Sequence, residues 1–242
     1  PRPPPVQFPR ARALKKHNLA MANFPSALLP ARVTILAYGA LLSEASSRLT
    51  FPTLSNFRLV RVPGMRRLFG MSHLLLTREG VADPATLRIA ALSVEPAEGT
   101  SFIAAAYDVE LDDVQREAFC AREIGYDIRS VPFCELDEAS SSNSGVICAA
   151  SSDGALPPGF PVPAGLPVWD WSPSSGLLPA DVYLRHCLLA MSKIGGEAEQ
   201  SFLHDTTLVD RTTSVSDYLD GGARERVMAV RPPERMAARF GG

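Results

Sequence analysis

Residues 35–44, ILAYGALLSE, join an apolar run to a polar segment through a Tyr-Gly pair. The pattern predicts a buried strand over residues 33–38 that runs into a tight loop. Gly39 permits backbone conformations that a Cβ would forbid, and it allows a ligand to approach the backbone amides closely. Successive amides in such a bend can hold an anion. An ordinary turn from a strand to a helix is the alternative interpretation of this stretch taken alone.

A second stretch, AREIGYDI at residues 121–128, follows a predicted helix and precedes an apolar strand. The acidic pair at 112–113 supplies an N-cap and a negative first turn, and the spacing of apolar residues predicts an amphipathic helix over 114–122. Glu123 then lies at the C-terminal end of this helix, where the helix dipole disfavours a carboxylate. The alternative is a solvated carboxylate beside Arg122.

Taken together, the two stretches resemble the gamma-glutamylcyclotransferase-like superfamily. Its members carry a Tyr-Gly-Ser-Leu or Tyr-Gly-Ser-Asn loop after the first strand, and a later glutamate that transfers the proton. In the glutathione-specific branch this glutamate lies in an Arg-Glu-x-Gly-Tyr-like run, which four residues here match: Arg122, Glu123, Gly125 and Tyr126. Residues 57–69, FRLVRVPGMRRLF, are similar to the second-strand region of these proteins. The resemblance covers residues 33–135 and is weaker beyond them.

The resemblance implies an α+β fold: a small mixed, mostly antiparallel β-barrel with flanking helices, here with a helical C-terminal extension. It also implies release of 5-oxoproline from a γ-glutamyl compound, which could be glutathione, a γ-glutamyl amino acid or a γ-glutamylamine. In this chemistry Glu123 is the catalytic residue. The implied substrate-binding residues are Tyr38, Gly39, Ala40, Leu41 and Tyr126. No cofactor and no metal ion are implied.

The implied reaction requires a base for an α-amine whose pKa is about 7.7 to 8.0, whereas a free glutamate has a pKa of about 4.3. We therefore expect the pKa of Glu123 to be raised, and partial burial at a helix C-terminus acts in that direction.

Ala40 departs from the family pattern, because it stands where the family usually has serine. The backbone amide survives this change and the hydroxyl does not; a hydrogen bond to a charged group is worth about 1.5 to 3 kcal/mol. A catalytically weak or inactive member of the fold, acting as a small-acid binding protein or as a subunit of a larger assembly, is therefore the alternative function.

The composition is that of an ordinary globular protein, with 46% hydrophobic and 21% charged residues among 242. A net charge of -2 offers no general basic field for nucleic acid, and no apolar run approaches the roughly 18 to 20 residues of a membrane-spanning helix. The expected partner is a small-molecule γ-glutamyl substrate, with no nucleic acid and no membrane insertion. Four widely spaced cysteines predict free thiols in a reducing, intracellular compartment, and the four histidines lack the spacing of metal ligands.

The first 32 residues are basic and rich in proline, and the first acidic residue is Glu44. This composition predicts either the remnant of a chloroplast or mitochondrial transit peptide, or a flexible arm through which the protein assembles with others. We expect a barrel domain over 33–150, a Pro/Gly-rich insertion over 151–180 held to the barrel by Trp169 and Trp171, and a helical extension over 181–242.

Within these parts the sequence predicts further elements. The expected strands cover residues 57–62 with continuation over 66–69 past a turn or bulge at 63–64, 72–76, 88–95, 101–109, 128–136 and 146–150. Residues 96–100 are expected to form a hairpin turn. The expected helices of the C-terminal part cover residues 180–194, 198–203 and 214–219. We expect the basic run after Gly222 to fray, and the adjacent Arg66 and Arg67 to be solvated on a strand edge.

Overall fold

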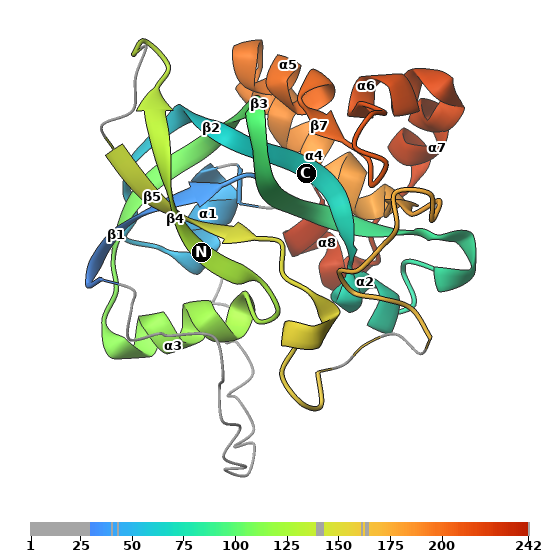
Figure 1. The fold of residues 1–242 in the computed structure, drawn as a ribbon, viewed down its shortest axis with the longest axis horizontal. Helices are drawn as coiled ribbons and strands as arrows, with labels where there is room; N and C mark the ends of the chain where they lie inside the picture. Colours follow the sequence, from blue (N-terminus) through green and yellow to red (C-terminus); the bar gives the residue numbers. More distant parts are fainter. Residues whose placement is uncertain are drawn as a thin grey trace, which may run out of the picture.

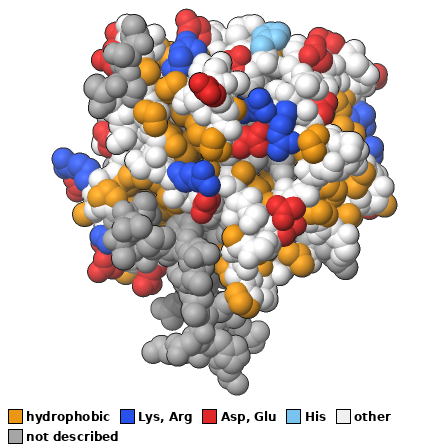
Figure 2. Space-filling model, viewed as in Figure 1, with side chains coloured by type: hydrophobic (Ala, Val, Ile, Leu, Met, Phe, Trp, Pro, Cys, Tyr) orange, Lys and Arg blue, Asp and Glu red, His pale blue; other side chains and the backbone are white. Residues whose placement is uncertain are grey.

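The computed structural model describes most of the chain after the proline-rich start: residues 30–39, 41–42, 44–138, 143–160, 162 and 165–241. The predicted N-terminal arm lies outside these residues, apart from its last three. No helix in the described ranges is both long enough and apolar enough to cross a membrane. On the face seen in Figure 2, the described acidic and basic side chains are interspersed, not separated into areas of one sign.

Five strands close into a barrel, and the first of the two predicted stretches begins in one of them. In the order in which they pair, they are β3 (Arg88–Glu110), β1 (Arg32–Ala37), β5 (Asn143–Ala149), β4 (Asp127–Glu135) and β2 (Ser55–Ser72). β2 pairs back with β3, and this pairing closes the barrel. β1 and β5 are parallel, whereas the other four pairings of the barrel are antiparallel. The predicted mixed, mostly antiparallel barrel is thus confirmed.

β2 and β3 are long strands that bend together at a shared irregularity (Figure 1). The register shifts between Pro63 and Met65, where Gly64 has a φ of 70°. Opposite this bulge, the Thr100 hydroxyl donates to the Met65 carbonyl at 3.0 Å, which satisfies an acceptor that the ladder leaves open. Of the predicted alternatives, a turn or a bulge, the structure shows a bulge. The predicted hairpin turn at 96–100 is wrong. These residues lie within the continuous strand β3, at the place where its register with β2 shifts.

Eight α-helices within the described ranges surround the barrel: α1 (Glu44–Thr50), α2 (Leu74–Arg78), α3 (Asp113–Arg122), α4 (Asp181–Ile194), α5 (Gly196–His204), α6 (Val215–Tyr218), α7 (Arg224–Ala229) and α8 (Glu234–Phe240). Shorter elements are β6 (Leu178–Pro179) and β7 (Thr206–Thr207) on the sheet edges, 3-10 turns at Pro84–Thr86 and Asp153–Ala155, and a π segment at Leu219–Ala223. Figure 1 shows α4 to α8 gathered on one side of the barrel and α3 on another.

Two local predictions are wrong. Residues 72–76 were expected as a strand, but His73 caps α2 instead, with its Nδ1 accepting from the amide of Leu76 at 3.4 Å. The run after Gly222 was expected to fray, but it forms α7 and α8, because Val227 and Phe240 are almost fully buried in the core. Long-range burial outweighs the local signals in both cases.

A buried arginine joins the C-terminal helices to the barrel. Arg67 on β2 is fully buried, so the expectation that it is solvated is wrong. Its Nε donates to Thr206 Oγ1 at 2.7 Å and its Nη1 to the Ile103 carbonyl at 3.0 Å. The guanidinium lies 5.0 Å from the ring centroids of Phe102 and Phe202. Burial lowers its pKa to about 10.

The Pro/Gly-rich segment is anchored by hydrogen bonds and by a buried indole. Asp153 Oδ1 accepts from the backbone amides of Val168 and Trp169, both at 2.9 Å. The Trp169 ring is buried and meets the Tyr126 ring edge to face, with centroids 5.1 Å apart. The Trp171 indole donates to Ser72 Oγ at 3.1 Å. These contacts hold residues 156–160 beside the end of α3.

Candidate functional site

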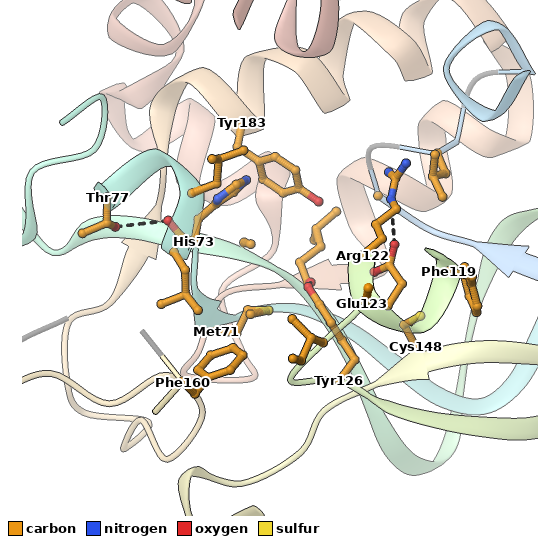
Figure 3. A pocket seen from close by; sticks show the side chains of 18 of the residues that line it. Met71, His73, Thr77, Phe119, Arg122, Glu123, Tyr126, Cys148, Phe160 and Tyr183 are labelled. Atoms are coloured by element: carbon orange, nitrogen blue, oxygen red, sulfur yellow. Dashed lines mark hydrogen bonds and ion pairs between the residues drawn. The ribbon is translucent and has the colours of Figure 1, made fainter. Parts of the chain in front are cut away.

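A cavity of about 970 Å³ opens where β1 ends, and elements from the whole described chain line it. The turn after β1, α2, the end of α3, β5, the Pro/Gly-rich segment, α4 and α8 each contribute side chains to its walls. Figure 3 shows that labelled side chains from α2, the end of α3, β5, the Pro/Gly-rich segment and α4 point into one space. Its volume is within the range of small-molecule sites.

The cavity brings together the two stretches that the sequence singled out. Tyr38, Gly39 and Leu41 from the first stretch line it, and so do Glu123 and Tyr126 from the second. Ala40, the remaining predicted site residue, lies outside the described residues.

Glu123 is the C-cap residue of α3, and its side chain is only 17% exposed. The helix begins as predicted, with Asp112 as N-cap: Asp112 Oδ1 accepts from the amide of Gln115 at 2.7 Å. Glu123 Oε1 accepts from Arg122 Nε at 2.9 Å, and Arg122 Nη1 donates in turn to Thr50 Oγ1 at the end of α1. The carboxylate is thus beside Arg122, as the alternative interpretation has it, but it is largely withdrawn from solvent.

Cys148 on β5 lies against this carboxylate (Figure 3). Burial, followed by the charge of Glu123, raises the pKa of its thiol well above the ordinary value, so the thiol is protonated at neutral pH.

The hydroxyl groups of the two predicted tyrosines donate hydrogen bonds to backbone carbonyls of the barrel strands. The Tyr38 hydroxyl donates to the Cys148 carbonyl, and the Tyr126 hydroxyl donates to the Leu92 carbonyl at 3.0 Å. Burial raises the pKa of both phenols well above 10, so both are neutral. Core packing and lining of the cavity are therefore combined in the same side chains.

The turn after β1 is tightly fixed. The amide of Leu42 donates to the Gly39 carbonyl at 2.9 Å, and Ser47 Oγ on α1 donates to the Leu41 carbonyl at 2.7 Å. Gly39 is required here by a close approach: a Cβ at this position would lie 2.6 Å from the hydroxyl oxygen of Tyr183 on α4. The C-terminal part thus contacts the predicted loop directly.

The residues that line the cavity without having been predicted include His73, Tyr183 and Arg239. Figure 3 shows the Tyr183 hydroxyl directed into the cavity, on the side facing Arg122 and Glu123. The His73 ring packs edge to face on Tyr183, with centroids 5.0 Å apart. Burial, followed by the positive charge of Arg239, lowers the pKa of His73 to about 3, so this imidazole is neutral. No local sequence signal marks these positions, because only tertiary contacts bring them to the site.

The charge of the cavity is unbalanced. Among the described residues that line it are three arginines, Arg78, Arg122 and Arg239, and one carboxylate, Glu123. A site with this excess of positive charge attracts anionic ligands. Within the described ranges, no group of three or more His, Cys, Asp or Glu side chains is arranged to hold a metal ion.

Comparison with solved structures finds similar folds at low identity. The chain is similar to a crystal structure of an uncharacterized protein from Homo sapiens, at 12% identity over 85% of this chain and 91% of that chain, with a TM-score of 0.46. It is also similar to a gamma-glutamyl cyclotransferase, at 12% identity over 84% and 90% of the two chains, with a TM-score of 0.48. A solution structure from Arabidopsis thaliana matches at 13% identity over 61% and 82%, with a TM-score of 0.37.

One of these structures bears the name of the superfamily that the two sequence stretches resemble. At these identities and TM-scores, the similarities carry no information about the activity or substrate of this protein. No protein-family model matches the chain, and no curated protein matches it.

Proposed function

We propose that this protein is a gamma-glutamylcyclotransferase-like enzyme that releases 5-oxoproline from a γ-glutamyl compound. The observation that carries the proposal is the meeting of Glu123 with Tyr38, Gly39 and Leu41 in one cavity, although the two stretches are far apart in the sequence. This is the pairing of a proton-transfer group with a backbone turn that the sequence resemblance implies.

In the proposed reaction the α-amine of the substrate attacks its own γ-carbonyl carbon. A new C–N bond closes the five-membered ring, and the original amide C–N bond breaks. Glu123 accepts the proton that the α-amine loses and returns it to the leaving nitrogen, so no water or external base is consumed. Folding the substrate so that its nitrogen meets its carbonyl carbon is an orientation effect, and such effects supply several kcal/mol.

Other residues of the cavity have supporting roles in this proposal. The turn at 38–41 offers backbone groups to the substrate carboxylate and to the oxygen that gains negative charge. The ion pair with Arg122 fixes the position of the Glu123 carboxylate. Tyr126 and Tyr38, whose hydroxyl protons are already donated to backbone carbonyls, shape the wall.

The test is release of 5-oxoproline by the purified protein from glutathione, γ-glutamyl amino acids and γ-glutamylamines. Glu123→Gln keeps the shape of the side chain and removes the base, so we expect a loss of about 100-fold or more in kcat. Glu117→Gln is the matched control, because Glu117 is exposed on the same helix and does not line the cavity. Release that is equal in Glu123→Gln and wild type would refute the role of Glu123.

The second candidate function is binding of a small acid without catalysis, in a protein that acts alone or in an assembly. The excess of arginines in the cavity and the alanine at position 40 favour it. Calorimetric binding of γ-glutamyl compounds or of 5-oxoproline, with no turnover of any compound by the folded protein, would select this function over the first.

A further inference from the structure

Helix α8 forms a wall of the cavity. Phe240 is 1% exposed, and its ring packs edge to face on His73 and Tyr183, with centroid distances of 5.6 and 6.4 Å. Because both of these partners line the cavity themselves, the position of α8 is fixed relative to the site. The neighbouring residue, Arg239, lines the cavity and is also exposed to solvent, so this residue lies at the rim.

Arg239 differs from the other arginines of the cavity in having no carboxylate within ion-pair distance among the described residues. Arg122 is paired with Glu123 at 2.9 Å, and Arg78 approaches Glu79 at 3.7 Å. The contact that the structure does give Arg239 is with a ring: its guanidinium carbon lies 5.4 Å from the centroid of Phe240. This contact leaves the hydrogen-bond donors of the guanidinium available to a ligand.

The electrostatic surroundings favour an anion beside Arg239. Partial burial, followed by the like charge of Arg122, lowers the pKa of Arg239, whereas the negative charge of Glu123 raises it. Its charge in turn contributes to the lowered pKa of His73. A carboxylate bound to Arg239 would relieve both effects, and a guanidinium binds a carboxylate through two parallel hydrogen bonds.

We propose that Arg239 binds a carboxylate on the leaving-group portion of the substrate, so that the enzyme prefers γ-glutamyl amino acids and peptides to γ-glutamylamines. This inference rests on the proposed function, which assigns the turn at 38–41 and Glu123 to the glutamyl portion. The leaving group then extends from Glu123 toward the rim, where α8 presents Arg239. The cavity of about 970 Å³ has room for both portions.

The test compares γ-glutamylalanine with γ-glutamylethylamine, whose leaving groups differ by one carboxylate. We expect wild type to favour γ-glutamylalanine by about 10- to 100-fold in kcat/KM, the range that charged hydrogen bonds provide. Arg239→Gln should reduce this preference to a few-fold, mainly through a higher KM for γ-glutamylalanine, and Arg239→Lys should retain part of it. Such a change in KM is what loss of a substrate-binding contact produces.

Arg235→Gln is the matched control, because Arg235 is on the same helix but pairs with Glu79 at 3.4 Å, away from the cavity. This variant should retain the wild-type preference. If Arg239→Gln lowers kcat/KM for both substrates equally, the effect is a structural disturbance and the inference is overturned. An absence of preference in wild type also overturns it.

A binding measurement separates this inference from the proposed function. Affinities of both compounds are measured by calorimetry in Glu123→Gln, with and without the additional Arg239→Gln change. Tighter binding of γ-glutamylalanine that depends on Arg239 supports the carboxylate subsite, even if wild type releases no 5-oxoproline and the proposed activity fails. If the affinity for γ-glutamylalanine is the same with and without the Arg239→Gln change, the subsite is overturned, even if wild type releases 5-oxoproline.

Discussion

At the scale of single residues, the site depends on a few close approaches. Gly39 and Tyr183 form one of them, because a Cβ on residue 39 would lie 2.6 Å from the tyrosine hydroxyl oxygen. Real Cβ atoms essentially never come so close to a neighbour, so Gly39 is required by its surroundings, whatever ligand the loop binds.

Gly39→Ala is therefore expected to destabilise the protein by about 1 to 3 kcal/mol, the usual cost of an extra methyl group in a packed region. Tyr183→Phe in the same chain should restore part of the loss, because it removes the atom that clashes. Denaturant unfolding of the single and double variants measures both effects. Gly154→Ala is the control, since nothing lies within 4 Å of the added Cβ. Equal stability of Gly39→Ala and wild type would show that the close approach of residue 39 to Tyr183 does not limit the side chain at this position.

Of the residues that line the cavity, the sequence predicted only those that local motifs mark. Glu123 and Tyr126 were found through a short run of residues, and Tyr38, Gly39 and Leu41 through the turn after a strand. Tyr183 and Arg239 could not be found in this way. Each is an unremarkable position on its own helix, and its place at the cavity results only from the packing of that helix.

At the scale of elements, caps and periodicity predicted β1, α3 and α4 well. The elements that were predicted wrongly are those whose form depends on a distant partner. β2 and β3 bend together, so neither strand alone shows that residues 96–100 continue the sheet. α8 is held by contacts of Phe240 with His73 and Tyr183, which no local pattern indicates.

The N-cap of α2 makes the stability of the protein sensitive to acid. His73 has a pKa of about 3 in the folded protein and about 6.5 when unfolded. Between these values the unfolded state binds more protons, so the free energy of unfolding falls as the pH falls. The slope reaches roughly 1.4 kcal/mol per pH unit within this window.

His73→Asn tests this prediction, because asparagine retains an N-cap acceptor and does not titrate. We expect wild type to lose stability relative to this variant between pH 6.5 and about pH 4, as measured by urea unfolding at a series of pH values. The carboxylates of the protein titrate in both proteins and cancel in the difference. Parallel pH curves for the two proteins would contradict the prediction.

At the scale of the whole molecule, the C-terminal helices and the barrel share one core. Residues 102–107 of β3 are almost fully buried along their length, which requires cover on both faces of the strand. Arg67 contacts both sides of this junction, through the Ile103 carbonyl and through Thr206. We therefore expect the barrel and the helices to unfold together.

Arg67→Ala should lower the free energy of unfolding by about 3 to 5 kcal/mol, since it leaves a large void between Phe102 and Phe202. Arg67→Met should cost much less, because it fills most of the volume and removes a buried charge whose two hydrogen-bond acceptors, Thr206 Oγ1 and the Ile103 carbonyl, are neutral. Tryptophan fluorescence reports on Trp169 and Trp171, and circular dichroism reports on the helices. Separate transitions in wild type would contradict the shared core.

The placement of α8 has a consequence for the synthesis of the protein. A chain leaves the ribosome from its N-terminal end, and its parts begin to fold in that order. The turn at 38–41 and Glu123 therefore emerge well before Arg239. A nascent chain that has completed the barrel already possesses the carboxylate proposed to transfer the proton, and the wall proposed to choose between substrates is added to it later.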